Sequence, residues 1–487
     1  MAETNLFLCL RPGHRLLRHS LVALIAGFLA GCAWMPELES HAEMKPVEAY
    51  QGDQTLKGTQ PGWPEDQWWE AYGDPQLATL IEEGLAGSPN MTIAEARLRR
   101  AVAMAGLAES ALYPDVDANA SVSMEKQSYK HIMGRNAKRG WRDYGQATLD
   151  FSWEIDFWGK NRAAYAAATS AAEAAEAERA EAELVLTTSI ASEYGELARL
   201  FAAHDTVSAA VAVRSKNLTL FRNRFKEGME TMASVRQEEA RLAAAEEELL
   251  ELEEMISLQR NRLAALIGAG PDRGLSITRP SLKVKGFGIP EEMQLALLGR
   301  RPDIVAARKR VESSASTIEQ RKAEFYPNVN LTAFIGFQSL GLNHLVSSGS
   351  DFGAAGPAIS LPIFNGGRLR SQLFVAQAEL EEAIGNYNLT VTEALQQVAD
   401  AAASQQALGR QIVKINEAVD AAREAHRIVN NRYNGGLSNY IEVLAAEETL
   451  LTNMRAQSDL LSRSFTLDVA LIKALGGGYT VPAENKE

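Results

Sequence analysis

Seven histidines and two cysteines are the residues of this 487-residue chain that could most readily bind a metal or act in catalysis. The histidines lie at positions 14, 19, 41, 131, 204, 344 and 426. Two belong to an N-terminal leader, and no pair of the others has the spacing of metal ligands. The sequence has neither a phosphate-binding glycine loop nor a GxSxG nucleophile elbow. We therefore expect no enzymatic activity, no metal site and no cofactor.

The charge balance narrows the possible partners. The chain has 49 basic and 62 acidic residues, a formal net charge of −13, and 46% apolar residues. Binding to a phosphate backbone requires clustered Lys and Arg, so we expect no nucleic-acid partner.

Cys32, which directly follows an N-terminal leader, is the cysteine with distinctive chemistry. An uncharged run, Leu21 to Ala30, is too short to span a bilayer but is typical of a secretory signal peptide. It ends in Leu29–Cys32 (LAGC), which is similar to the bacterial lipobox. We expect residues 1–31 to be removed and Cys32 to carry an S-diacylglycerol and an N-palmitoyl chain; the alternative is an ordinary signal peptide with an incidental cysteine. Ala33, in place of an aspartate, favours delivery to the outer membrane.

The rest of the chain is an internal duplication. Pro89, Tyr113 and Pro114 recur 213 positions later as Pro302, Tyr326 and Pro327, and Arg224, Gly228 and Val235 recur 208 positions later as Arg432, Gly436 and Val443. Each half has the pattern of a short helix, two strands, a long helix, a turn and a returning helix. A repeat of this length is much longer than a solenoid unit and predicts a pseudo-twofold chain.

Each half contains a pair of alternating segments. Leu149, Phe151 and Trp153 alternate with Asp150 and Ser152, and similar alternation occurs from 116 to 125, from 328 to 338 and around 359 to 363. Such segments are typical of outer-membrane barrel strands, although a half-buried soluble sheet is the alternative.

Other features of these segments bear on a membrane location. Trp141, Tyr144 and Trp158 lie near strand ends, as interfacial aromatic residues do. Four strands are too few to close a barrel, so insertion into a membrane would require two or three chains.

The long helices are predicted from proline-free regions. Residues 159–228 and 366–434 contain no proline; about 70 residues at about 1.5 Å each would extend roughly 105 Å, against about 30 Å for a hydrocarbon core. Neither region is apolar enough to enter lipid, so we expect each to cross an aqueous compartment. Apolar positions recur every seven residues and predict antiparallel coiled-coil packing: Ile190, Leu197, His204, Val211, Leu218 and Phe225 in the first half.

Together these features resemble the TolC-like outer-membrane efflux factors, in particular their NodT-type lipoprotein branch. The similarity rests on the lipobox at Cys32 and on several short motifs: Trp68–Trp69, Asp74–Pro75, Arg301–Ile304, Tyr326–Pro327, and Pro362–Phe364 followed by Gly366–Arg368. Of these, Asp74 and Pro75 are interpreted as the N-cap and first turn of a helix.

The resemblance implies a mixed α/β membrane protein. Its fold would be a homotrimeric twelve-stranded outer-membrane β-barrel, with four strands from each protomer, continued by a long periplasmic α-helical barrel. It would lie in outer-membrane lipid and conduct substrates passively from a periplasmic adaptor and an inner-membrane RND-type pump. Drugs or other small toxic compounds are the expected substrates; metal-ion efflux, type I protein secretion and a lipid-anchored periplasmic scaffold or adaptor are the alternatives.

The resemblance also implies roles for residues at the turns between the long helices. The expected adaptor-contact residues are Arg224, Gly228 and Thr231 in one turn and Arg432, Gly436 and Ser438 in the other. Glu442 falls at the family's acidic pore constriction, whereas Ala445 replaces a second acidic residue common there, and Arg308 stands where glutamate is usual.

The predicted organisation follows from these elements. It comprises a signal peptide at 1–31, a lipidated segment with a short helix at 32–88, helices at 89–114 and 302–326, strand hairpins at 115–158 and 327–365, long helical hairpins at 159–268 (turn near 224–234) and 366–476 (turn near 432–442), a linker at 269–301 and a tail at 477–487.

Overall fold

The structure is a computed structural model that describes residues 35–38, 41–46, 49–50, 62–126, 128, 130, 140–283, 290 and 293–481. The predicted signal peptide and Cys32 lie outside these residues. The chain divides into two compact units. The first contains residues 1–43, 101–172 and 310–384, and the second contains residues 44–100, 173–309 and 385–487.

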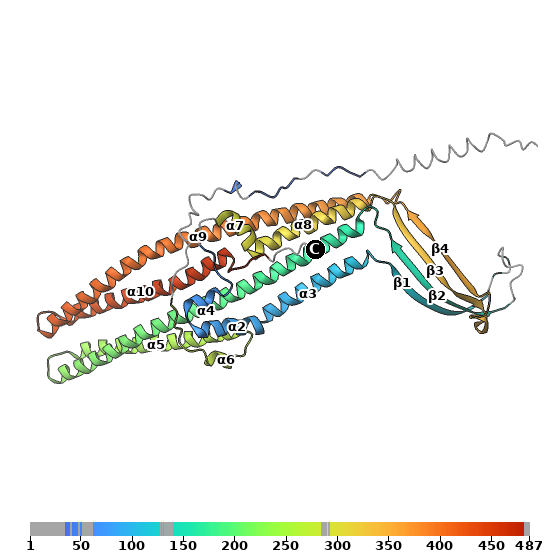
Figure 1. Cartoon of the computed structure of the whole chain (residues 1–487). Helices are drawn as coiled ribbons and strands as arrows, with labels where there is room; N and C mark the ends of the chain where they lie inside the picture. The colour runs from blue at the N-terminus through green and yellow to red at the C-terminus, as the bar shows by residue number, and fades with distance from the viewer. Residues whose placement is uncertain are drawn as a thin grey trace, which may run out of the picture. The chain divides into compact units, whose positions relative to one another are not determined.

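The first unit is built on one antiparallel sheet of four strands in the order β1-β2-β3-β4, shown side by side in Figure 1. The strands are β1 (Asp115–Glu125), β2 (Arg142–Glu154), β3 (Asn328–Leu340) and β4 (Asp351–Ser360). Each half of the duplication contributes one hairpin, and the two hairpins join where β2 pairs with β3. The prediction of four strands per chain is therefore confirmed.

Two strands end earlier than the alternation predicts. β4 stops at Ser360 instead of continuing to Ile363, because Pro362 has no N–H to donate to a ladder. β2 stops at Glu154 instead of Phe157, since Asp156 accepts a hydrogen bond from the backbone N of Arg162 (2.9 Å) at the start of the next helix. The residues between the strands and the helices thus form tight turns.

The long helices form two hairpins. In the first, α4 (Lys160–Lys226) is followed by α5 (Met232–Leu266), and in the second, α9 (Arg368–Asn434) is followed by α10 (Tyr440–Leu475), as Figure 1 shows. Both α4 and α9 have 67 residues, as the duplication would require. Within the described ranges, no helix combines the length and the apolarity needed to cross a membrane.

Shorter helices complete the chain. They are η2 (Trp68–Tyr72), α2 (Pro75–Gly87), α3 (Pro89–Ser110), α6 (Pro271–Leu275), α7 (Met293–Arg300), α8 (Pro302–Ala323) and η4 (Leu342–His344). Asp74 is the N-cap of α2 and accepts from the backbone N of Gln76 at 3.0 Å, which confirms its predicted role. The same carboxylate accepts from the Tyr194 hydroxyl at 2.8 Å, so the cap also ties α2 to α4.

The core of the second unit explains the Trp68–Trp69 motif. Trp68, Tyr72 and Leu77 are buried with Leu197 of α4 and Phe465 of α10 in one apolar cluster. The Tyr72 and Phe465 rings lie 4.7 Å apart, edge to face. Burial of such aromatic side chains stabilises the junction of η2, α4 and α10.

The seven-residue ladder of α4 is followed only in part. Leu197 and Leu218 are buried, but Phe225 is 37% exposed, and Phe221 is buried in its place. The Phe221 ring packs 4.3 Å from that of Tyr440. A helix with 3.6 residues per turn drifts from a strict seven-residue repeat, so the buried stripe has rotated by the end of α4.

Arg301, from the Arg301–Ile304 motif, joins three helices. Its side chain is 7% exposed and forms an ion pair with Asp303 at 2.6 Å. Its guanidinium also donates to Gln397 of α9 (2.9 Å) and to the carbonyl of Ala474 in α10 (3.0 Å). The start of α8 is thereby fixed to the second helical hairpin.

Glu181 of α4 lies beside this cluster. Burial, together with the charge of Asp303, raises the pKa of its carboxyl from 4.5 to about 7, although Arg301 and Lys473 act in the opposite direction. The folded chain therefore holds a proton that the unfolded chain releases between about pH 4.5 and 7. Stability should fall as the pH rises through this range.

We predict that Glu181→Gln will flatten the dependence of stability on pH. The wild type should lose stability between about pH 4.5 and pH 7, by about 3 kcal/mol at most from this group, and the variant should lose less. Thermal unfolding midpoints in detergent across this range provide the measurement. Glu417→Gln, an exposed carboxylate on α9, is the control; identical profiles for Glu181→Gln and wild type would contradict the prediction.

Candidate functional site

The predicted site residues lie in the turns that join the long helices. Gly228 has φ 73° and Gly436 has φ 72°, a conformation that favours glycine. The backbone N of Met229 donates to the carbonyl of Arg224, and that of Leu437 to Arg432, both at 2.8 Å. The two turns therefore have the same closing hydrogen bond, as the duplication predicts.

Side-chain caps start the returning helix after each turn. The Thr231 hydroxyl accepts from the backbone N of Ser234 at 3.2 Å, and the Asn439 side chain accepts from the backbone N of Glu442 at 3.1 Å. These caps satisfy backbone donors that would otherwise lack partners at a helix start. Gly228 and Thr231 thus shape their own turn.

Arg224 connects the first hairpin to the second. Its guanidinium donates to the Tyr433 hydroxyl at 2.7 Å and lies 5.1 Å from the centre of that ring. Burial raises the pKa of Tyr433, so its hydroxyl stays neutral and can accept this hydrogen bond. The Tyr433 ring packs 5.2 Å from Tyr440, which packs on Phe221. One polar and several aromatic contacts thus join the ends of the hairpins.

The corresponding residue of the second turn behaves differently. Arg432 is exposed and donates to the carbonyl of Leu437 within its own turn, at 3.4 Å. Ser438 donates to the exposed carboxylate of Glu442 at 3.0 Å. The duplication is therefore broken at the turns, because Arg224 reaches across to the other hairpin and Arg432 does not.

A second connection between the hairpins contains buried charge. Glu238 of α5 is 1% exposed and accepts from the Tyr440 hydroxyl at 3.4 Å. Glu447 of α10 is 7% exposed and lies 3.6 Å from the guanidinium of Arg214. Burial raises the pKa of Glu238, and the nearby Glu447 charge adds to this effect. Removing one member of such a pair leaves an uncompensated buried charge, so these contacts fix the relative position of the hairpins.

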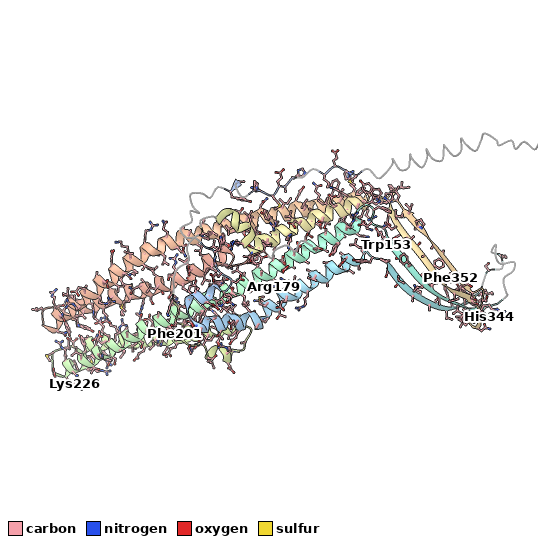
Figure 2. All side chains as sticks on the ribbon, viewed as in Figure 1. Trp153, Arg179, Phe201, Lys226, His344 and Phe352 are labelled. Atoms are coloured by element: carbon pink, nitrogen blue, oxygen red, sulfur yellow. The ribbon has the colours of Figure 1, made fainter. Side chains whose placement is uncertain are left out.

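Farther along the helices, Arg455 of α10 pairs with Glu248 of α5 at 2.8 Å. The hairpins are consequently linked at Tyr433, at Glu447 and at Arg455, and also at Asp459, which pairs with Arg199 of α4 at 3.2 Å. Figure 2 labels Lys226, the last residue of α4, at the end of the first hairpin. Sequence reasoning did not identify Tyr440, Glu238 or Glu447, because each acquires its role from a partner on the other hairpin.

The sheet of the first unit has one apolar and one polar face. The register places Leu149 between Ala118 and Ile335, and most of the large apolar residues of the four strands share this face. Its large side chains are exposed: Val116, Val122, Met124, Leu149, Ile335, Phe337 and Ile359, with Ile359 at 71%. A half-buried soluble sheet packs its apolar face against a core. The sheet of this chain differs, because its apolar face is exposed.

The two outer strands have one unpaired edge each. β1 pairs only with β2, and β4 pairs only with β3, within the four-stranded sheet. The outer edges of 11-residue β1 and 10-residue β4 therefore present backbone donors and acceptors to whatever lies beside them.

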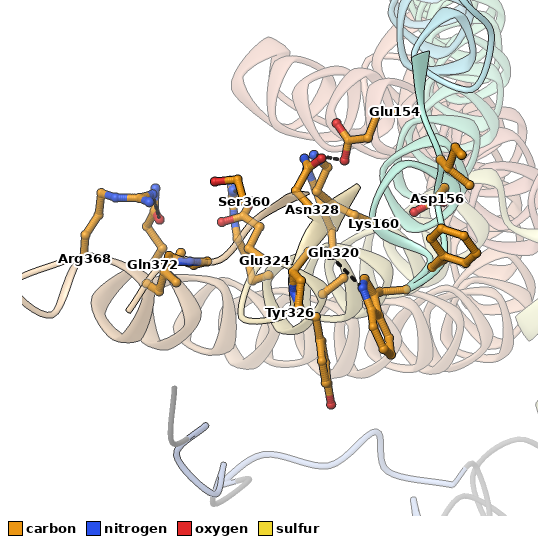
Figure 3. A pocket seen from close by; sticks show the side chains of 18 residues that line it. Glu154, Asp156, Lys160, Gln320, Glu324, Tyr326, Asn328, Ser360, Arg368 and Gln372 are labelled. Atoms are coloured by element: carbon orange, nitrogen blue, oxygen red, sulfur yellow. Dashed lines mark hydrogen bonds and ion pairs between the residues drawn. The ribbon is translucent and has the colours of Figure 1, made fainter. Parts of the chain in front are cut away.

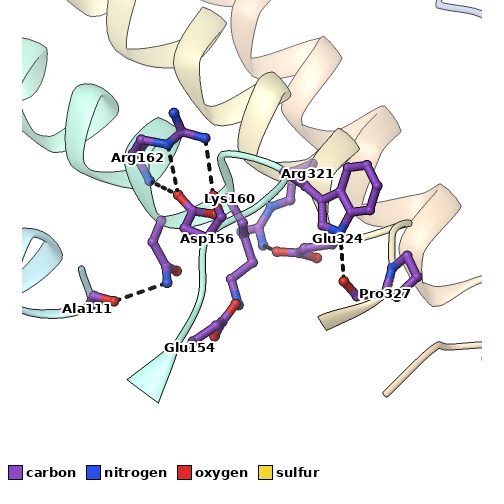
Figure 4. Close-up of polar contacts among 10 residues, drawn as sticks. Ala111, Glu154, Asp156, Lys160, Arg162, Arg321, Glu324 and Pro327 are labelled. Atoms are coloured by element: carbon purple, nitrogen blue, oxygen red, sulfur yellow. Dashed lines mark hydrogen bonds and ion pairs between the residues drawn. The ribbon is translucent and has the colours of Figure 1, made fainter. Parts of the chain in front are cut away.

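The turns between strands and helices are fixed by polar contacts (Figure 4). Trp158 donates its ring N–H to the carbonyl of Pro327 at 2.8 Å, and Asn161 donates to the carbonyl of Ala111 at 3.1 Å. Arg162 pairs with Asp156, and Lys160 pairs with Glu154. The start of α4 is therefore tied to the ends of both shorter helices, α3 and α8.

A cavity of about 520 Å³ lies at these turns (Figure 3). Its cations include Lys160 and Arg321, which are paired with Glu154 and Glu324 respectively. Because the lining charges neutralise each other within the chain, we assign the cavity a structural role. Among the described residues there is also no group of three or more His, Cys, Asp or Glu arranged to hold a metal ion.

Comparison with known proteins identifies the class to which this arrangement belongs. The outer membrane efflux protein family model matches residues 80–269 and 295–477, and the chain belongs to this family. It is an outer membrane efflux channel, as predicted, and not an enzyme or a periplasmic scaffold.

Individual relatives agree with this assignment. The chain is 35% identical to the fusaric acid resistance protein FusA of Burkholderia cepacia, over 73% of this chain and 68% of that protein. It is 31% identical to the multidrug resistance outer membrane protein MdtQ of Escherichia coli O157:H7, over 93% of this chain and 96% of that protein. The crystal structure of the outer membrane protein VceC of Vibrio cholerae is similar, with 48% identity and a TM-score of 0.82, over 85% of this chain and 100% of that one.

Proposed function

We propose that three copies of this chain form an outer-membrane channel for drugs or other small toxic compounds. In this proposal a twelve-stranded barrel spans the membrane, and the helical hairpins of the three copies form a periplasmic tube. The tube receives substrate from a periplasmic adaptor and an inner-membrane pump of the RND type and conducts it passively.

One observation carries the proposal: an exposed apolar face on a sheet with two unpaired edges. In hydrocarbon, each backbone group without a partner costs several kcal/mol, so a spanning sheet must close. The 10 to 13 residues of each strand suit a tilted crossing of the membrane. Exposed Trp141 and Trp158, which flank β2, suit the two membrane interfaces.

The proposed number of copies follows from the need for a passage through the barrel. Two copies would give about eight strands, whose interior is filled by side chains. Three copies give about twelve, which leaves a passage for solutes. The substrate class is supported by the names of the relatives, which concern multidrug resistance and resistance to fusaric acid.

The turns of the helical hairpins are the proposed closure and adaptor-contact region. Opening a ring of hairpins requires them to separate, and contacts between them oppose this movement. The bond between Arg224 and Tyr433 is such a contact. A hydrogen bond to a charged donor contributes about 1.5–3 kcal/mol.

We predict that Tyr433→Phe and Arg224→Met will each raise the open probability of the reconstituted channel, by about tenfold or more for a loss of this size. Single-channel recording in planar bilayers is the measurement. Arg427→Met is the matched control, because Arg427 pairs with Glu424 on an exposed face of the same helix as Tyr433. If both tip variants gate like the control, the bond has no part in closure.

The Glu442 carboxylate is the proposed pore constriction. Three carboxylates near the axis of a narrow tube would attract cations and repel anions. Ser438 and the cap at Asn439 hold the start of α10, and with it Glu442, in place.

We predict that Glu442→Gln will lower the preference for cations over anions. Reversal potentials under a salt gradient are the measurement, with Glu251→Gln, an exposed carboxylate on α5, as the control. Unchanged selectivity in Glu442→Gln would remove this residue from the constriction.

The lipid anchor at Cys32 is part of the proposal. Met35 and Leu38 pack in one apolar cluster with Phe325 and Leu369, close in sequence to β3 and to the start of α9. Three residues reach at most about 10 Å, so acyl chains on Cys32 would meet the membrane near the strand ends. The segment continues along α9, where the backbone N of His41 donates to Glu381 at 3.3 Å.

We predict that Cys32→Ser will abolish acylation and processing of the leader, which the intact mass of the membrane-extracted protein will report. Cys9→Ser is the control, since that cysteine leaves with the leader. A wild-type protein without the added mass of the acyl chains would overturn the anchor while leaving the channel proposal in place.

A further inference from the structure

Two aromatic side chains interrupt the polar face of the sheet. In β3, the side chains of Asn330, Thr332 and Gln338 lie on the polar face, and the side chain of Phe334 lies on the same face. In β4, Phe352 also lies on this face, and the two rings are in contact, with centres 5.3 Å apart and planes at 55°. Figure 2 labels Phe352 on the sheet. Apart from Leu340 at the end of β3, the other large aliphatic residues of these strands lie on the opposite face, so the pair requires a separate explanation.

Small residues surround the pair. The neighbours of Phe334 along its own strand and across to β4 include Gly336, Ala354 and Gly356. A side chain at Gly336 would collide with the backbone of β2 at Ala147 and Thr148, so glycine is required there. Small neighbours have no side chain that could extend over the rings. Both rings are half-buried and retain accessible surface on the polar face.

One carboxylate, Asp150, lies directly beside Phe334, and a second, Asp117, lies beside Asp150. The register places Asp150 opposite Phe334 on one side and opposite Asp117 on the other. Asp150 accepts hydrogen bonds from Asn119 (3.0 Å) and Thr148 (2.7 Å), which orient its carboxylate on this face. Like charges directly opposite each other destabilise a sheet, so facing carboxylates indicate a role other than stability.

The strands offer little positive charge to neutralise these groups. The acidic residues of the polar face are Asp115, Asp117, Glu125, Asp150 and Glu154, of which Glu154 pairs with Lys160. Arg142, the first residue of β2, is the one basic residue of the four strands. The polar face therefore combines exposed aromatic surface with unneutralised negative charge. A cation positioned over an aromatic ring gains about 0.5–2 kcal/mol, and a nearby carboxylate adds to this attraction.

An aromatic pair could also serve only to stabilise the sheet. Cross-strand aromatic pairs contribute about 0.2–1 kcal/mol, and that contribution would be similar for a pair on the apolar face. The position on the polar face, with glycines around it, Asp150 in the adjacent strand and Asp117 in the next, is explained by a ligand and not by stability.

We propose that Phe334, Phe352, Asp150 and Asp117 form a transit subsite for aromatic organic cations. The inference rests on the proposed function, in which the polar face lines the lumen and three copies of the subsite surround it. The rings contact the aromatic part of the solute, and the carboxylates attract its positive charge. Binding is weak, because a conducting site must release what it binds.

The test is open-channel block in single-channel recordings of the full-length reconstituted protein. Benzyltributylammonium is the probe, tetrabutylammonium is the cation without a ring, and benzenesulfonate is the aromatic anion. We expect the benzyl cation to block most strongly. In Phe334→Leu/Phe352→Leu and in Asp150→Asn its apparent Kd should rise about tenfold, with the double Leu variant blocked equally by both cations.

Phe337→Leu is the matched control, since it removes a ring from the opposite face of the same strand. Open-channel conductance in each variant reports assembly, so a protein that forms no channel contradicts the proposed function and not only the subsite. Normal conductance with equal block by the two cations in the wild type would overturn the subsite. So would equal effects of Phe337→Leu and Phe334→Leu/Phe352→Leu on block by the benzyl cation.

Discussion

The unpaired backbone of two strand edges is the constraint on which the rest of the structure depends. β1 and β4 are the outer strands of the four-stranded sheet, and each has one edge without a partner in it. The large side chains of the apolar face are exposed. Water can satisfy an open edge, and lipid can cover an apolar face, but neither solvent can do both. A sheet with both features is stable in a membrane only when other strands complete it. In the proposed trimer, identical copies of the same chain would supply those strands.

Within each unit, the helices are fixed to their neighbours by specific polar contacts. The turns at Trp158 and Asn161 tie the start of α4 to the ends of α8 and α3, and Arg301 fixes the start of α8 to α9 and α10. At the hairpin ends, the contact of Arg224 with Tyr433 is one hydrogen bond with aromatic packing, whereas Arg214, Glu238 and Glu447 form a buried polar group farther from the turns. The contacts at the hairpin ends therefore differ in kind from the buried charges farther from the turns.

The sequence predicts local features well for a physical reason. Alternation predicts the strands because successive residues of a strand point to opposite faces of the sheet. The Asp74 cap is predicted because it acts on residues close to it in the sequence. Tyr433, Tyr440, Glu238 and Glu447 could not be assigned a role, since their partners lie about two hundred residues away on the other hairpin. Phe225 was misplaced because a fixed repeat of seven does not follow a helix of 3.6 residues per turn over its full length.

The duplication is exact enough to predict the order of the elements but not their differences. Arg224 and Arg432 occupy equivalent positions, yet only Arg224 contacts the other hairpin. The neighbours of Phe334 could not be predicted from its own segment, because the pairing that places it beside Asp150 is between strands from different halves. Such asymmetry arises from the neighbours of a residue and is not visible in its own segment.

Native mass spectrometry of the protein released from detergent tests the closure of the sheet most directly. The account predicts a single species with the mass of three chains that persists until the strands unfold. A monodisperse single chain that retains its full strand content would contradict it, since an open sheet would then be stable with its edges unpaired.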